Sequence, residues 1–172
     1  MQNFLVFSLP RSGSAWLSVL LTYQESFCYH EPLSEPETLE ELFKRPNSGG
    51  VDTMAYLWPS LRQRYRCFVL KRDYAEIEQS SRQCGVDYKA PVEKFEAATF
   101  GLPVIDYHKF DQITYLERIW IMIVGTAFDP CRARQLIGMN IQRDLEKYRL
   151  KAPHLAHFPD QAKSLRGSRY TG

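Results

Sequence analysis

A short polar turn between two apolar runs contains residues that can bind an anion. Residues 4–17 read FLVFSLPRSGSAWL, so the turn joins an expected strand to an expected helix. The first N–H groups of a helix have no intrahelical partner, and the helix dipole adds positive potential there. Gly13 permits a close approach of the backbone to a ligand, and Ser12 and Ser14 add hydroxyl groups. Arg11 adds a permanent forked cation. The turn is therefore either an anion-binding loop or a plain turn whose serines cap the helix.

A second arginine follows another apolar strand. Residues 68–73 read FVLKRD, and Ser80 stands eight residues after Arg72. This spacing places Arg72 at the end of a strand and Ser80 about two turns into the next expected helix. In the alternative interpretation, Arg72 pairs with Asp73 or Glu76 at the surface, and Ser80 is an ordinary helical serine.

The basic residues around this strand are clustered. Residues 62–72, RQRYRCFVLKR, contain five basic residues and no acidic residue. Such a cluster indicates either an anionic ligand nearby or a solvated basic face.

A third segment supplies two groups that can accept a proton. Residues 29–33 read YHEPL, at the end of a short expected strand. A glutamate in a partly desolvated cleft can have its pKa raised toward neutrality, which would make Glu31 a general base. His30 is the competing base. Strand alternation points these neighbours in opposite directions, so we expect one of them to face a cleft. The alternative is a polar strand terminus without chemistry.

Three segments together resemble the sulfotransferases that use 3′-phosphoadenosine 5′-phosphosulfate (PAPS). Residues 10–17, PRSGSAWL, resemble the family's 5′-phosphosulfate loop, and Arg72 with Ser80 resembles its 3′-phosphate element. The YHEPL segment is similar to the EPL segment of carbohydrate-type and bacterial members. Two positions depart from the pattern: Ala15 stands where a hydroxyl group is common, and Tyr74 stands where proline is common.

The resemblance implies a reaction and roles for the residues. The reaction would move a sulfonyl group from PAPS to an acceptor hydroxyl or amine, without a metal. Arg11 would stabilise the departing 5′-phosphate, and either Glu31 or His30 would remove the acceptor's proton. The residues implied to bind PAPS, or its product 3′,5′-ADP (PAP), are Arg11, Ser12, Gly13, Ser14, Ala15, Trp16, Arg72 and Ser80.

Two other functions remain open. A nucleotide or small-molecule kinase of the P-loop class would use the same fold, but the GxxxxGK[ST] motif and an evident carboxylate pair for magnesium are absent from the sequence. A non-catalytic protein could keep the fold as a binding or structural module, which the short chain and Ala15 favour. The acceptor is not indicated.

Strands alternate with helices along the chain, which predicts an α/β three-layer sandwich with a central parallel sheet. The resemblance implies that this sandwich is P-loop nucleotide-kinase-like. We expect one domain over residues 1–153 and an irregular basic tail over 154–172. A flexible loop is expected over 45–52. Strands are expected over 3–8, 27–29, 67–70 and 103–106, and helices over 14–23, 34–44, 53–65 (in two pieces), 73–83, 91–99, 111–125, 130–136 and 144–150.

Composition limits the partners. The chain has 172 residues and a net charge of +2, which does not call for nucleic acid or a membrane surface. No apolar run approaches the roughly 20 residues of a membrane span, and the N-terminus does not read as a signal peptide. The four cysteines lack CxxC spacing, and nothing completes a metal site around His154 and His157. We therefore expect free thiols, no metal and a cytoplasmic setting.

Overall fold

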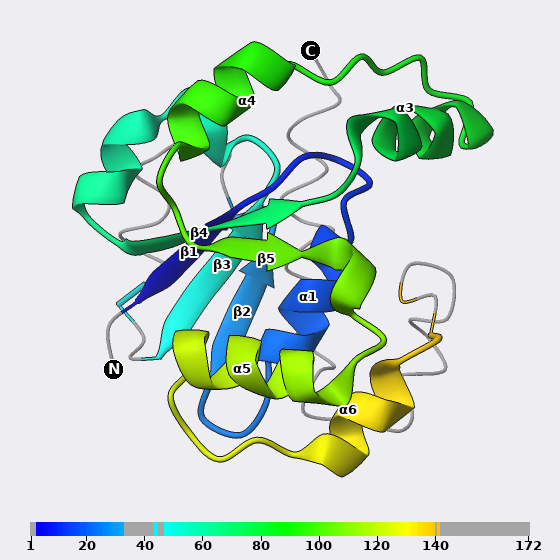
Figure 1. Cartoon of the computed structure of the whole chain (residues 1–172). Helices are drawn as coiled ribbons and strands as arrows, with labels where there is room; N and C mark the ends of the chain where they lie inside the picture. The colour runs from blue at the N-terminus through cyan, green and yellow to red at the C-terminus, as the bar shows by residue number, and fades with distance from the viewer. Residues whose placement is uncertain (1–2, 33–42, 45–46, 140, 142–172) are drawn as a thin grey trace.

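A parallel β-sheet forms the centre of the molecule (Figure 1). The structure is a computed structural model, and it describes residues 3–32, 43–44, 47–139 and 141. The strand order is β2-β3-β1-β4-β5, and every neighbouring pair is parallel. The strands are β1 (Phe4–Phe7), β2 (Phe27–His30), β3 (Ser48–Asp52), β4 (Arg66–Lys71) and β5 (Val104–Asp106).

Helices cover both faces of this sheet (Figure 1). The predicted α/β three-layer sandwich with a central parallel sheet is confirmed. The α-helices are α1 (Ser14–Leu21), α3 (Tyr74–Gln83), α4 (Val92–Thr99), α5 (Ile113–Ile123) and α6 (Pro130–Leu136), and the 3-10 helices are η1 (Ala55–Leu57), η2 (Pro59–Gln63) and η3 (Tyr107–Lys109).

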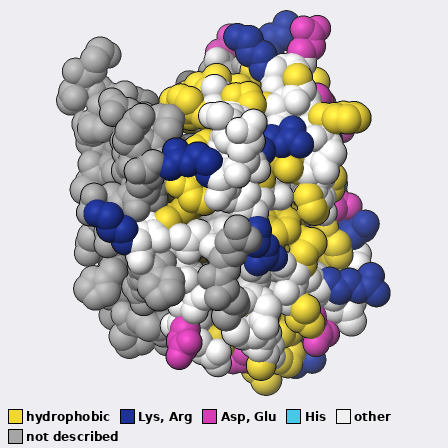
Figure 2. Space-filling model, turned by 90° about the vertical axis from the view of Figure 1, so that its left-hand side faces the viewer, with side chains coloured by type: hydrophobic (Ala, Val, Ile, Leu, Met, Phe, Trp, Pro, Cys, Tyr) yellow, Lys and Arg dark blue, Asp and Glu magenta, His cyan; other side chains and the backbone are white. Residues whose placement is uncertain are grey.

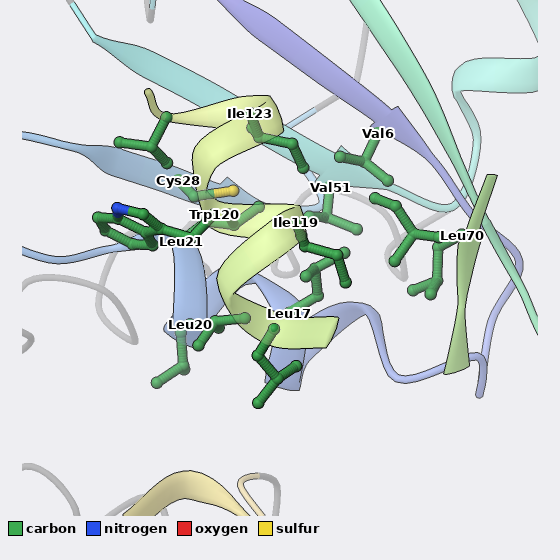
Figure 3. Packing of buried hydrophobic residues seen from close by; sticks show 14 of the residues in the cluster. Val6, Leu17, Leu20, Leu21, Cys28, Val51, Leu70, Ile119, Trp120 and Ile123 are labelled. Atoms are coloured by element: carbon green, nitrogen blue, oxygen red, sulfur yellow. The ribbon is translucent and has the colours of Figure 1, made fainter. Parts of the chain in front are cut away.

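Alternate residues of the strands point into two separate apolar layers. Val6 packs in the layer with α1, α5 and α6, whereas Leu5 packs in the layer with α3, α4 and η1. Figure 3 shows the first layer, in which Leu17 of α1 and Ile119 of α5 share one cluster with Val6 and Leu70. Complete burial of each such aliphatic side chain contributes about 1.5–3 kcal/mol. The sheet therefore has a rigid core on both faces, and its carboxyl edge is held in place.

Most predicted elements are present, with shifted ends. The helical segment 53–65 does lie in two pieces, both of them 3-10 helices, and Pro59 begins the second. The helix predicted over 34–44 lies largely outside the described residues, as do the helix over 144–150 and the tail over 154–172.

The flexible loop predicted over 45–52 is wrong. Residues 48–52 form β3, which is fully buried and lies between β2 and β1. The loop was predicted because two adjacent glycines, Gly49 and Gly50, are typical of loops. Their role here is close packing: a Cβ at Gly49 would lie within 2.4 Å of three ring carbons of Phe4. The missing side chain makes room for a buried aromatic ring from β1.

The charged surface is dispersed on the face shown in Figure 2. Lys and Arg side chains lie at separate places there, among hydrophobic and uncharged groups. In the part of the chain that the structure describes, every helix is too short or too polar to cross a membrane. The expectation of no nucleic-acid partner stays a prediction.

The packing of β3 against Phe4 gives a stability prediction. Gly49→Ala should lower the free energy of unfolding by about 1–3 kcal/mol, because the new methyl group overlaps the Phe4 ring. Urea unfolding followed by circular dichroism measures this loss. In a Phe4→Leu background, the loss of unfolding free energy caused by Gly49→Ala should be smaller than in the wild type. Equal losses from Gly49→Ala in both backgrounds would contradict the packing argument.

Candidate functional site

The strand order reverses between β1 and β4, which opens a crevice at their carboxyl ends. From β1 the chain continues through α1 to β2 on one side, and from β4 it continues through α3 and α4 to β5 on the other. Ligands of open parallel sheets bind in such crevices. Arg11 follows β1 and Arg72 follows β4, so both arginines stand at this edge.

A pocket of about 590 Å³ lies at this edge, and it brings together residues from both predicted segments. Seven of the eight residues expected to bind PAPS line it. Ser12 does not, because its buried hydroxyl donates to the carbonyl of Leu9 at 2.6 Å. The lining residues are Arg11, Gly13, Ser14, Ala15, Trp16, Arg72, Ser80, Tyr107, His108, Phe110, Asp111, Ile137, Gly138, Met139 and Ile141.

The turn after β1 has a backbone that few residue types adopt. Arg11 has φ of 64° and Gly13 has φ of 91°, both in the left-handed region. A Cβ at Gly13 would lie 2.7 Å from the ring of Tyr107, so a side chain there would also collide with the opposite wall. Ser14, Ala15 and Trp16 then begin α1, where the backbone N–H groups have no intrahelical partner. The result is a helix N-terminus that faces the pocket, as an anion site requires.

The two arginines are connected to each other and to Ser80. Arg72 donates from Nη1 to the carbonyl of Arg11 at 2.8 Å. Arg11 donates from Nε to Oγ of Ser80 at 3.2 Å. The guanidinium of Arg72 also lies over the ring of Tyr107, 4.4 Å from its centroid. Ser80 is therefore not an ordinary helical serine, since it helps to fix the cation of the turn.

The surface pair proposed as the alternative for Arg72 is present as well. Nε of Arg72 lies 2.9 Å from a carboxylate oxygen of Glu76, and the other oxygen of Glu76 is 3.8 Å from His108. The Arg72 side chain is 19% exposed, so this pair is only partly screened by water. Arg72 thus lines the pocket and is at the same time neutralised by Glu76.

Two other basic residues of 62–72 hydrogen-bond to backbone carbonyls of other segments. Arg62 donates to the carbonyls of Ala98 and Phe100, and Arg66 donates to that of Met122 at 2.6 Å. The basic cluster in the sequence therefore largely links segments of the fold through hydrogen bonds.

Lys71 shows why adjacent cations have different roles. Its Nζ lies 2.7 Å from Oε2 of Glu96, and Oε1 of the same carboxylate accepts a hydrogen bond from Tyr74. Hydrogen bonds from Lys71 and Tyr74 lower the pKa of Glu96, and burial is the main cause that raises the pKa of Tyr74. Lys71 is bound in this cluster, whereas the next residue, Arg72, lines the pocket.

The aromatic wall opposite the turn was not predicted from the sequence. Tyr107, His108 and Phe110 come from η3 and the residue after it, directly following β5. Phe110 stacks on Trp16 with ring centroids 4.9 Å apart, and Trp16 donates from Nε1 to the carbonyl of Leu136 at 2.9 Å. The available signal was an aromatic segment after a strand, but its importance depends on β5 lying beside β4.

The two expected proton acceptors lie outside the pocket lining but reach it through Ser14. Nε2 of His30 is 3.1 Å from Oγ of Ser14, and His30 is 5% exposed. Oε1 of Glu31 lies 3.8 Å from the same nitrogen and accepts a hydrogen bond from Thr53 at 3.3 Å. The expectation that these neighbours point apart is wrong. Glu31 has φ of 53°, which ends the strand alternation and turns its side chain toward His30.

Among the described residues, no three His, Cys, Asp or Glu side chains gather in an arrangement that could hold a metal ion.

Comparison with known proteins gives one distant similarity. No family model matches the chain, and no curated protein matches it. The structure is similar to the crystal structure of a sulfotransferase from Alicyclobacillus acidocaldarius, with a TM-score of 0.44 and 12% identity. The alignment covers 92% of this chain and 94% of that one. A similarity this distant assigns neither a cosubstrate nor an activity to this chain.

The Arg72–Glu76 pair gives a prediction about anion binding. Glu76→Gln should raise the affinity of the pocket for inorganic sulfate several-fold, because the carboxylate no longer competes for the Arg72 guanidinium. Titration followed by amide NMR signals of the turn measures this change. Glu117→Gln removes an exposed carboxylate from α5 and serves as the charge-matched control. Equal gains in both variants would show a general charge effect and contradict the prediction.

Proposed function

We propose that the chain is a PAPS-dependent sulfotransferase, which moves a sulfonyl group to an acceptor hydroxyl or amine. One observation carries the proposal: Arg11, Arg72, Ser80 and the N-terminus of α1 line a single pocket. These groups come from segments about sixty residues apart in the sequence, and each is suited to a phosphate or sulfate group.

The composition of the pocket supports a nucleotide with two anionic ends. Its volume of about 590 Å³ lies within the usual range for small-molecule and cofactor sites. Arg11 and the start of α1 offer one anion position, and Arg72 offers a second cation beside them. Tyr107 and Phe110 add apolar side chains to the lining, as is usual for cofactor sites.

The residues at the turn would act on the leaving group. Bound PAPS supplies an activated sulfonyl group, whose S–O bond to the 5′-phosphate breaks as a bond to the acceptor forms. The N–H groups at the start of α1, together with Arg11, stabilise the negative charge that develops on the departing phosphate oxygen. The proton of the acceptor passes to Glu31 or His30. The products are the sulfated acceptor and 3′,5′-ADP.

A second candidate is a binding module that holds the nucleotide without transfer. The observation that favours it is the position of Glu31 and His30, neither of which lines the pocket. Binding and transfer must therefore be tested separately.

The first test is binding of 3′,5′-ADP by calorimetry. Arg11→Ala and Arg72→Ala should each weaken binding at least about tenfold, or about 1.4 kcal/mol, because each removes a charge-assisted contact. Arg118→Ala, which removes an exposed cation from α5, should leave binding unchanged.

Comparison with 5′-AMP sharpens this test, because 5′-AMP lacks the 3′-phosphate. Arg72→Ala should abolish most of the preference for 3′,5′-ADP over 5′-AMP, whereas Arg11→Ala should weaken both ligands similarly. Absence of 3′,5′-ADP binding at high micromolar ligand would overturn the proposal. Magnesium-dependent preference for ATP would favour a kinase instead.

The second test separates an enzyme from a binding module. With PAPS carrying labelled sulfate and a library of hydroxyl and amine acceptors, the wild-type chain should form a labelled product. Glu31→Gln should lower kcat at least about tenfold with little change in 3′,5′-ADP affinity if Glu31 takes the proton. Binding without transfer to any acceptor would favour the binding module.

A further inference from the structure

The contact between His30 and Ser14 links a titratable group to the anion site. We propose that His30 is a positioning residue that controls the hydrogen bond of the Ser14 hydroxyl, so that anion binding at the turn is coupled to protonation of His30. The inference rests on the part of the proposed function that places an anion at the start of α1. It does not depend on sulfonyl transfer.

The Ser14 hydroxyl has one proton to donate, and this decides the coupling. Nε2 of His30 lies 3.1 Å from Oγ of Ser14, and both side chains are buried. When Nε2 carries no proton, it accepts the proton of Ser14, and the hydroxyl then presents lone pairs to the pocket. When Nε2 is protonated, it donates to Oγ, and the hydroxyl proton is available to an anion. An anion therefore selects the forms of His30 with a proton on Nε2.

The surrounding charges favour the imidazolium among those forms. The carboxylate of Glu31 lies 3.8 Å from Nε2 and favours a positive ring, as does a bound anion. The guanidinium of Arg11, in the same turn as Ser14, opposes it. Buried Asp52, at the end of the neighbouring strand β3, accepts a hydrogen bond from the N–H of Met54. From α1, the group that meets the ring is the hydroxyl of Ser14, which does not titrate near neutral pH. Anion binding should therefore be accompanied by proton uptake.

The arrangement differs from that of a serine nucleophile. In a Ser-His-acid triad, the acid contacts the ring nitrogen that the serine does not. Here Glu31 approaches the same nitrogen that contacts Ser14. This geometry suits control of a hydrogen bond better than activation of the Ser14 oxygen.

Inorganic sulfate is the probe for the test, because its charge stays constant between about pH 5.5 and 8, where histidine titrates. Sulfate is titrated at constant ionic strength into the full chain, and the amide NMR signals of Ser14 and Ala15 are followed. The affinity of the wild-type chain should fall by up to tenfold per pH unit across this range, the limit for one linked proton.

Three variants assign the pH dependence. His30→Gln should retain binding but lose the pH dependence, because its amide N–H donates to Ser14 at every pH. Ser14→Ala should also lose the dependence, since the coupled hydroxyl is gone. His108→Gln removes the histidine that lines the pocket, and it should keep the pH slope of the wild type whatever its absolute affinity.

The outcomes separate this inference from the proposed function. A pH slope that survives in His30→Gln, or that disappears in His108→Gln, overturns the coupling. Failure of sulfate to shift the Ser14 and Ala15 signals overturns it as well. Binding of 3′,5′-ADP that depends on Arg11 and Arg72 would in each case leave the proposed function standing. Sulfate binding that is coupled to His30, without binding of 3′,5′-ADP, would support the coupling and overturn the proposed function.

Discussion

The hydrogen bond from Arg72 to the carbonyl of Arg11 is the contact that joins the two halves of the pocket. It joins the segment after β4 to the turn after β1, across the point where the strand order reverses. The carbonyl of Arg11 belongs to a residue in the left-handed region, so the turn presents this oxygen only while its unusual backbone is kept. Gly13 keeps that backbone accessible, and the ring of Tyr107 occupies the space beside it. The two cations therefore lie together because the strand order, the backbone of the turn and the packing of Tyr107 all bring them to one place.

An arginine also stabilises the scaffold away from the pocket. Buried Arg132 on α6 donates to the carbonyls of Val19, Leu20 and Thr22, at 2.5, 2.9 and 2.8 Å, and so satisfies the carboxyl end of α1. The opposite end of α1 lines the pocket, where we propose that an anion binds. The helix whose first N–H groups face the pocket is thus anchored at its other end by Arg132. Arginines thus contribute to the core packing as well as to the pocket lining.

The sequence predicts the parts of the site that local chemistry determines. The apolar runs before and after the turn at Gly13 predict β1 and α1. Asp73 fixes the start of α3, since its carboxylate accepts from the N–H groups of Ala75 and Glu76. Tertiary packing determines what was missed. Gly49 forms a buried strand because Phe4 fills the space beside it, and Tyr107 matters because β5 lies next to β4. Neither neighbour can be read from the local sequence.

The end of β2 shows how one backbone angle changes a chemical assignment. In a continuing strand, His30 and Glu31 would face opposite sides of the sheet, and they would compete for the role of base. The φ of 53° at Glu31 brings both to one side, with Nε2 of His30 at 3.1 Å from Ser14. His30 therefore contacts Ser14 at the N-terminus of α1, which a free base would not do. Glu31, whose side chain is 23% exposed, is left as the group that can meet a molecule arriving from solvent. In the proposed mechanism, the greater exposure of Glu31 would suit proton acceptance, and the proposed positioning role of His30 follows from its contact with Ser14.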